Sequence, residues 1–162
     1  MQRKVFLCPH ANFIISFHEY NLSVLNKKIL RVNYDFDFAL IGIISPMRAY
    51  RLCWFLNNQL KMNLEREEDL LLKNEQEEEM FFPKYYFYIE ESETDFYLLG
   101  NKGTDGYLIP EQKEIDFFML IYNLPERDGG AVLAKKIKLI QEIQSAFTLD
   151  PNKLRSRENL LF

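Results

Sequence analysis

Cysteine is scarce in this chain, which has Cys8 and Cys53 among 162 residues. A disulfide framework needs more thiols, so the composition favours a reducing, cytoplasmic location. Cys53 stands within an apolar helical pattern, where a cysteine usually acts as a small buried hydrophobe. We therefore expect an inert thiol at this position.

Histidine is equally scarce, with only His10 and His18 in the whole chain. Their spacing from Cys8 matches no zinc motif and lacks a fourth ligand, so no metal is expected. The rest of the chain contains no imidazole to activate a serine or cysteine nucleophile. We predict no metal and no cofactor.

Long apolar runs are also missing, because no stretch reaches the 18 residues that a membrane span needs. The short apolar run Val5–Cys8 follows two basic residues but is ended by Pro9, and no small-residue cleavage site follows it. We therefore expect neither membrane insertion nor export.

Positive charge is in deficit, with a formal net charge of −4. Nucleic-acid binding requires a basic surface, so it is not expected. The aromatic run Tyr85–Tyr88 resembles a base-stacking sheet, but only Lys84 is near it, and packing against other strands is the favoured interpretation. The segment Glu65–Glu79 holds eight acidic and two basic residues. It is typical of a solvated loop or helix face, with a partner-docking surface as the alternative.

The chain does have a large apolar fraction, 48%, and an aromatic fraction of 15%. The first supports a real core, and the second favours extended segments over an all-helical bundle. Residues 1–30 lack periodicity and are predicted to form an arm that is poorly ordered or outside the domain. Residues 31–162 are predicted to form one domain.

Hydrophobic periodicity predicts the elements of this domain. A strand is expected over Phe36–Ile44, followed by a cap at Ser45-Pro46 and a helix over Met47–Leu60. The apolar stripe of this helix, at spacings of three and four, is Ala49, Leu52, Cys53, Leu56 and Leu60. The remaining expected elements are a hairpin of Tyr85–Ile89 with Asp95–Gly100, a loop with glycines at positive φ over Asn101–Gly106, a strand over Ile115–Tyr122, a helix over Ala131–Ser145 and a strand over Ala146–Leu149. The segment Asn63–Leu72 is left open between a helix continuation and a short strand.

This order predicts an α+β fold, with a mainly antiparallel sheet and two helices packed on one face. A ferredoxin-like arrangement with extra hairpin strands is the specific expectation. Alternation in the strand Ile115–Tyr122 places Ile115, Phe117, Met119 and Ile121 on one face and Asp116, Phe118, Leu120 and Tyr122 on the other. Both faces are apolar past Asp116, so the strand should be covered on both sides or lie against another chain. Leu160, Leu161 and Phe162 are expected to tuck against the sheet.

The segment Ile109-Pro110-Glu111, followed after three residues by Ile115-Asp116-Phe117, resembles the signature of the IPExxxVDY family of small bacterial proteins. Isoleucine replaces valine and phenylalanine replaces tyrosine in the second half. The ending Lys153–Phe162, with basic residues leading into Glu-Asn and an apolar tip, also resembles the ends of family members. The resemblance covers roughly residues 34–162 and implies no catalytic residues.

Glu111 and Asp116 are the candidate acid/base pair, but a spacing of five along one strand would put them on opposite faces. The favoured interpretation makes Glu111 a turn residue near a backbone donor and pairs Asp116 with a basic side chain such as Arg48 or Arg51. Contacts with a ligand or partner at the six signature residues remain a candidate role.

Three functions follow. The first is a non-catalytic domain that binds a protein partner or itself, with Arg155 and Arg157 as candidate contacts to an acidic partner. The second is a small-molecule-binding regulatory domain with Glu111 and Asp116 at the ligand edge. The third is a hydrolase or isomerase that uses those two carboxylates.

Overall fold

The computed structural model describes residues 36–74, 76–126 and 128–162. The predicted arm over residues 1–30, with Cys8, His10 and His18, lies outside the described residues. The described part belongs to one compact unit, Asp35–Phe162.

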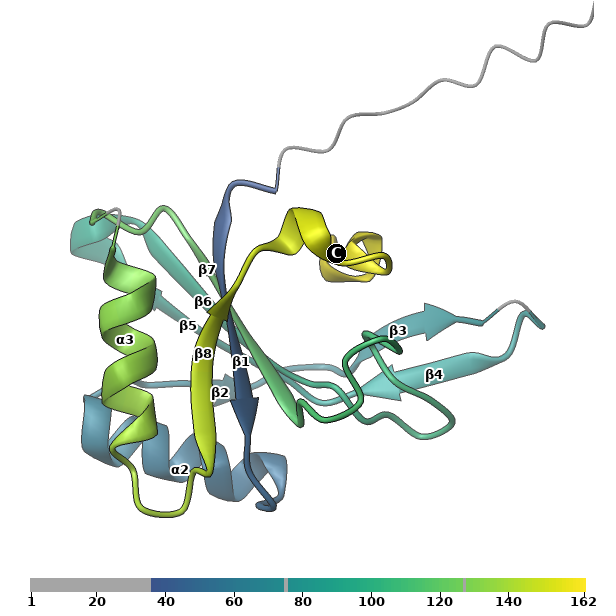
Figure 1. Cartoon of the computed structure of the whole chain (residues 1–162), viewed down its shortest axis with the longest axis horizontal. Helices are drawn as coiled ribbons and strands as arrows, with labels where there is room; N and C mark the ends of the chain where they lie inside the picture. The colour runs from purple at the N-terminus through teal and green to yellow at the C-terminus, as the bar shows by residue number, and fades with distance from the viewer. Residues whose placement is uncertain (1–35, 75, 127) are drawn as a thin grey trace, which may run out of the picture. The chain divides into compact units, whose positions relative to one another are not determined.

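The main sheet has six strands in the order β2-β5-β6-β7-β1-β8, and β3 and β4 form a separate hairpin (Figure 1). All neighbouring strands are antiparallel. The strands are β1 (Phe38–Ile44), β2 (Glu65–Arg66), β3 (Leu70–Lys73), β4 (Glu79–Phe82), β5 (Lys84–Ile89), β6 (Thr94–Gly100), β7 (Phe117–Tyr122) and β8 (Ser145–Leu149). The helices are α2 (Ala49–Leu60) and α3 (Gly129–Lys138), and the 3-10 turns are η3 (Glu90–Ser92), η4 (Pro151–Lys153) and η5 (Arg157–Leu160).

The inner four strands, β6-β7-β1-β8, have a ferredoxin-like order. Helix α2 lies on the connection from β1 toward β6, and α3 lies between β7 and β8. Strands β5 and β2 extend this core beyond β6. The predicted α+β class, with an antiparallel sheet, two helices and extra hairpin strands, is confirmed.

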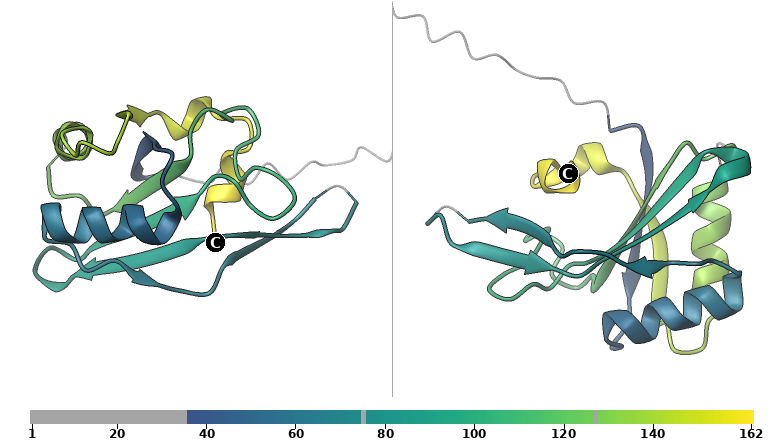
Figure 2. Two further views of the ribbon diagram at one scale, coloured as in Figure 1. Left: turned by 90° about the horizontal axis from the view of Figure 1, so that it is seen from below. Right: turned by 180° about the vertical axis from the view of Figure 1, so that it is seen from behind.

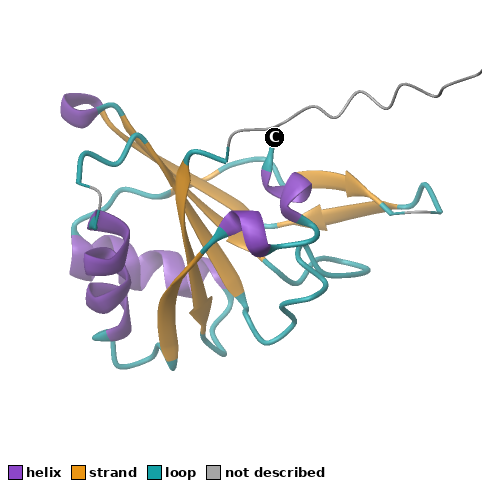
Figure 3. Cartoon of the chain, turned by 45° about the horizontal axis from the view of Figure 1, so that its top comes forward, coloured by secondary structure: helices purple, strands orange, loops and turns teal. Residues whose placement is uncertain are grey.

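Alternation along the central strands divides the core into two layers. Ile41 and Met119 pack in a cluster with the apolar faces of α2 and α3. Leu40, Phe118 and Leu120 belong to a second cluster on the opposite face. The helices therefore cover one face only, as Figures 1 and 3 show, with the short C-terminal turns on the other side of the strands from α2.

The second face is covered by the chain itself. The connection from β6 to β7 and the C-terminal tail bring their buried apolar side chains onto it, namely Leu108, Ile109, Ile115, Leu154 and Leu160. Phe162 adds an edge contact with the Tyr97 ring, with 5.2 Å between ring centroids. The two-sided cover predicted for β7 is thus present without a second chain, and the tail packs against the sheet as expected.

The first helix begins later than predicted. Its first residue is Ala49, and Arg48 precedes it with no side-chain cap. Ser45 does not cap this helix: its backbone N–H donates to Asp116 Oδ2 at 2.8 Å, and its hydroxyl donates to the Glu142 carbonyl at 3.4 Å. The Ser45 hydroxyl also accepts the Met47 N–H at 3.4 Å, but Met47 precedes the helix, so this local contact does not cap it.

The second helix ends at Lys138, earlier than the predicted Ser145. Turns replace its last part, with Ile140 and Ile143 donating from their backbones to carbonyls three residues back. Both side chains remain buried in the helical-face cluster. The turns therefore bury Ile140 and Ile143 as a helix would.

The glycines of the loop after β6 were expected at positive φ, and this is wrong: no described glycine has a positive φ. Four other residues do, including Lys61 and Glu93. Gly103 is instead needed for close approach, because a Cβ there would lie 2.7 Å from a ring carbon of Phe82 and 2.8 Å from the Phe81 carbonyl oxygen.

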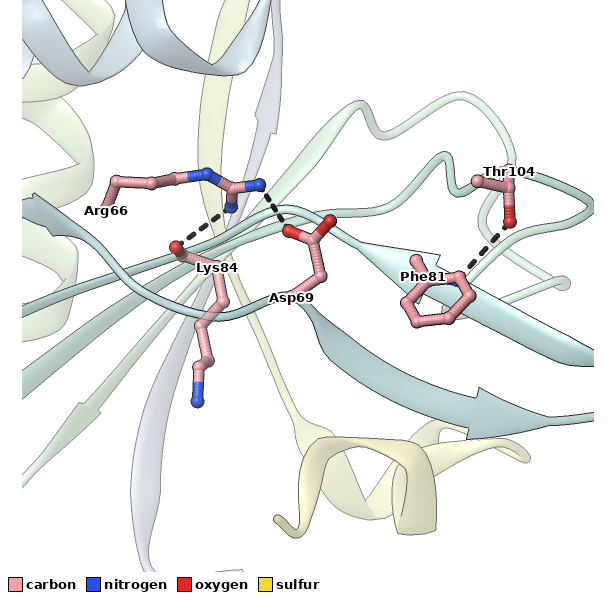
Figure 4. Close-up of polar contacts among 5 residues, drawn as sticks. All are labelled: Arg66, Asp69, Phe81, Lys84 and Thr104. Carbon is pink, nitrogen blue, oxygen red and sulfur yellow. Dashed lines mark hydrogen bonds and ion pairs between the residues drawn. The ribbon is translucent and has the colours of Figure 1, made fainter.

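The described acidic residues of Glu65–Glu79 are all exposed, and most of them (Glu67, Glu68, Asp69, Glu77 and Glu78) lie in the connections between strands. The predicted solvated loop is therefore confirmed for most of the block, although β2 and the hairpin of β3 and β4 interrupt it. This hairpin extends beyond the main sheet in Figure 2. Arg66 anchors its base by donating to the Lys84 carbonyl at 3.1 Å and pairing with Asp69 (Figure 4). Farther out, the Phe81 N–H donates to Thr104 Oγ1 at 3.4 Å. The open choice over Asn63–Leu72 resolves to strands.

Candidate functional site

The signature segment is built around the fully buried side chain of Asn101. Its amide donates to the carbonyls of Gln112 at 2.8 Å and Ile115 at 2.7 Å, and its Oδ1 accepts the Ile109 N–H at 2.8 Å. A buried amide with its side-chain bonds satisfied fixes the backbone path around it. Sequence reasoning missed Asn101, whose only signal is an asparagine directly after an apolar strand.

The apolar residues of the signature differ in burial, and their positions follow the alternation of a strand only in part. Ile109, Ile115 and Phe117 are buried, whereas Pro110 is exposed at the turn. Ile115 was expected to share a face with Phe117 but packs in the opposite cluster. The reason is that β7 begins only at Phe117. Ile115 lies in the preceding turn, where its backbone N–H donates to the Gln112 carbonyl.

Glu111 binds the C-terminal tail. Its Oε1 accepts the backbone N–H groups of Arg155 at 2.6 Å and Ser156 at 2.8 Å, and its Oε2 accepts the Ser156 hydroxyl at 2.9 Å. Burial alone would raise the pKa of Glu111, but the hydrogen bonds together outweigh it and lower the pKa below the ordinary value of 4.5. We call this set of three bonds the tail latch. It agrees with the predicted turn role beside backbone donors.

The two tail arginines are differently placed. Arg155 is exposed and contributes its backbone to the tail latch. The Arg157 guanidinium donates to the Asn152 carbonyl at 3.2 Å and lies 4.9 Å from the Phe36 ring centroid. Among the pair, Arg155 therefore has the freer side chain for an acidic partner, while Arg157 stabilises the tail.

Asp116 accepts the Ser45 N–H at 2.8 Å and does not pair with Arg48 or Arg51, so that prediction is wrong. The side chain helps to line a depression of about 390 Å³ beside the start of α2, together with Arg48 and Lys102. Glu111 does not line it. The two carboxylates thus serve different partners, and the geometry does not assemble them as an acid and base over one substrate.

Cys53 and Tyr86 have pKa values that disfavour their ionised forms. Burial raises the pKa of the Cys53 thiol to about 11, and its sulfur donates to the Leu64 carbonyl at 3.3 Å. The Tyr86 hydroxyl donates to Asp95 at 2.7 Å, which raises its pKa far above the ordinary tyrosine value. Both groups are therefore poor nucleophiles near neutral pH.

An apolar groove of about 610 Å³ lies between the end of α2 and α3, above β5 and β6. It lies on the helical side of the sheet, away from the tail latch. Sequence reasoning did not find it, since its residues come from five separate segments with no shared motif. It is lined by Gln59, Leu60, Lys61, Met62, Phe87, Ile89, Phe96, Leu124, Leu133, Lys136 and Leu139.

The two edges of the main sheet differ sharply. The β2 edge has only two residues, Glu65 and Arg66, and both are charged. The β8 edge has five residues with no charge, and within residues 36–162, as far as they are described, it pairs with β1 on one side only. Phe147 and Thr148 are exposed on it. Unpaired backbone groups on an uncharged edge can receive another strand.

Within the described ranges, no group of three or more histidine, cysteine, aspartate or glutamate side chains could hold a metal ion. In the same part of the chain, no helix is long and apolar enough to cross a membrane. Comparison with protein-family models gives no match, and comparison with curated proteins gives none either.

Proposed function

We propose that this protein is a non-catalytic, self-associating domain whose β8 edge pairs with β8 of a second copy. The observation that carries this proposal is the five-residue uncharged strand at the edge of the sheet, whose outer side has no strand partner in the described part of the chain. Proteins usually block such edges with charged residues, prolines or bulges. In this sheet the β2 edge follows that practice, and the β8 edge does not.

The arrangement suits a symmetric pair. Antiparallel pairing of two β8 strands is isologous, so each copy contributes the same residues to the interface. Because Ser145–Leu149 holds no charged side chain, two copies meet without like charges opposite each other. Phe147, 37% exposed, would gain cover from the partner strand. The result would be one continuous antiparallel sheet.

The groups suggested for catalysis support a binding role better than a chemical one. The Glu111 carboxylate is engaged by three donors of the tail, and Asp116 by the Ser45 N–H. Burial raises the Cys53 pKa to about 11. An enzyme based on Glu111 and Asp116, or a metabolite site with both at its edge, therefore has less support than self-association.

Light scattering after size exclusion tests the proposal on the full chain. The unmodified protein should be a dimer at high micromolar concentration, and Phe147→Lys and Thr148→Lys should each be monomeric because lysine on an edge disfavours pairing. Leu71→Lys is the matched control, since Leu71 is also exposed in a strand, but on the hairpin. A monomeric unmodified protein, or dimers that only Leu71→Lys disrupts, would contradict the proposal.

We also propose that the chain belongs to the IPExxxVDY family and is located in the cytoplasm. The two segments that resemble the IPExxxVDY family contact each other through Glu111 and Ser156. Beside this contact, the Asn159 amide donates at 2.8 Å to the carbonyl of Leu108, the residue before the signature. This contact supports membership of that bacterial family, and a solved member lacking the glutamate-to-tail bonds would count against it. The free, buried thiol of Cys53 supports a cytoplasmic location.

A further inference from the structure

The apolar groove between α2 and α3 has the composition of a site for one amphipathic molecule. Eight of its eleven lining residues are apolar, and they come from both helices, both underlying strands and the connection after β7. Its volume of about 610 Å³ is in the range of small-molecule sites, which are about 300–1,000 Å³. Leu139, at its lip, is 83% exposed.

The polar residues of the groove are two lysines and a glutamine. Lys61 follows the last residue of α2 in a left-handed conformation, and Lys136 lies in the last turn of α3. Both are exposed at the rim, and neither has an ion-pair partner among the described residues. No acidic residue lines the groove, although the chain as a whole is acidic.

From this charge complementarity we infer that the groove binds a free long-chain carboxylate of the fatty-acid type. The aliphatic tail would lie against Leu60, Ile89 and Leu133, and the carboxylate would meet the ammonium groups of Lys61 and Lys136. An apolar floor with a cationic rim fits one anionic head and one apolar tail. A concave site of this volume fits a single chain better than a membrane surface. The site is separate from β8, so this inference does not rest on self-association.

Displacement of dansyl-amino-undecanoate by unlabelled ligands, below their micelle concentrations, measures the affinity. Octanoate, decanoate and dodecanoate should bind with increasing affinity, by up to about fourfold for each methylene group that becomes buried. Dodecyl-trimethylammonium, with the same chain and the opposite charge, should bind more weakly than dodecanoate. Equal affinity along the carboxylate series, or equal affinity for both charges, would overturn the inference.

Two pairs of variants identify the site. Lys61→Gln with Lys136→Gln should weaken dodecanoate binding about three- to tenfold and leave dodecanol binding unchanged. Lys135→Gln with Lys138→Gln removes two charges from the same helix at positions that do not line the groove, and should change neither affinity. The assignment would be overturned if the Lys135 and Lys138 pair weakened dodecanoate binding and the Lys61 and Lys136 pair did not.

A third variant and two control arms complete the test. Leu139→Asp should also weaken dodecanoate binding, because it places a negative charge at the lip of the groove. Leu139 is exposed, so this change should not prevent folding. Phe147→Lys should bind dodecanoate as the unmodified chain does, which separates this site from the β8 interface. Absence of saturable binding, or binding only to phosphatidylglycerol vesicles, would contradict the inference.

Discussion

The Glu111 carboxylate binds both the backbone N–H and the hydroxyl of Ser156, 45 residues later in the chain, at 2.8 and 2.9 Å. This relationship joins the signature segment to the C-terminal tail. It holds the tail where Leu154 and Leu160 cover the second face of the sheet.

Glu111→Ala should destabilise the protein by about 1–3 kcal/mol, because hydrogen bonds to a charged acceptor contribute about that much and the tail donors lose their partner. Urea unfolding measures this change. Glu114→Ala is the matched control, since Glu114 is an exposed neighbour outside the tail latch. Equal, small effects of both variants would show that the latch contributes nothing.

The lowered pKa of Glu111 also makes stability depend on pH. The unfolded state binds more protons than the folded state between the two pKa values, so stability rises with pH in that window. The contribution is present above the unfolded value, near 4.5, and is lost as pH falls through the lower folded value. Glu111→Gln should therefore flatten this acid part of the stability profile. An unchanged slope in the variant would contradict the assignment.

Asn101→Ala should cost about 3 kcal/mol or more, because the Ile109 N–H and the carbonyls of Gln112 and Ile115 lose a buried partner at about 1–3 kcal/mol each. The signature segment should then exchange its amide hydrogens faster than β1 does. Lys102→Ala, at the exposed neighbouring position, is the control. A loss below 1 kcal/mol would show that the segment does not depend on this amide.

Leu160→Ala should destabilise the protein by about 2–5 kcal/mol, the cost of truncating a fully buried leucine. Leu139→Ala, at an 83% exposed leucine, should stay within about 0.5 kcal/mol. Denaturant unfolding measures both variants. Comparable small changes would mean that the tail is not part of the folded core.

Cys53 should resist alkylation in the folded protein. With a pKa of about 11, roughly one thiol in a thousand is ionised at pH 8. In a Cys8→Ser background, iodoacetamide should modify Cys53 only slowly until urea unfolds the chain. Rapid labelling under native conditions would contradict the burial described for this side chain.

The sequence predicted the elements that are governed by periodicity. Alternation placed Phe117 and Met119 opposite Phe118 and Leu120, and the structure has them in separate core layers. The helical stripe of Leu52 and Leu56 was found for the same reason. These patterns are local, so one sequence is enough to read them.

The features that depend on distant contacts were not predicted. Ser45 carries a capping signature, yet its N–H binds Asp116, 71 residues later. The apolar groove and the Asn101 hydrogen bonds likewise bring together residues from separate segments. Local propensity cannot report such contacts, because they follow from how the elements pack.

The most direct test of self-association through β8 is amide hydrogen exchange of the segment 145–149 as a function of protein concentration. We expect its exchange to slow as concentration rises through the dimerisation range, because the free side of β8 gains backbone partners. The hairpin of β3 and β4 should exchange at a constant rate. Exchange in 145–149 that is the same at all concentrations would contradict the account.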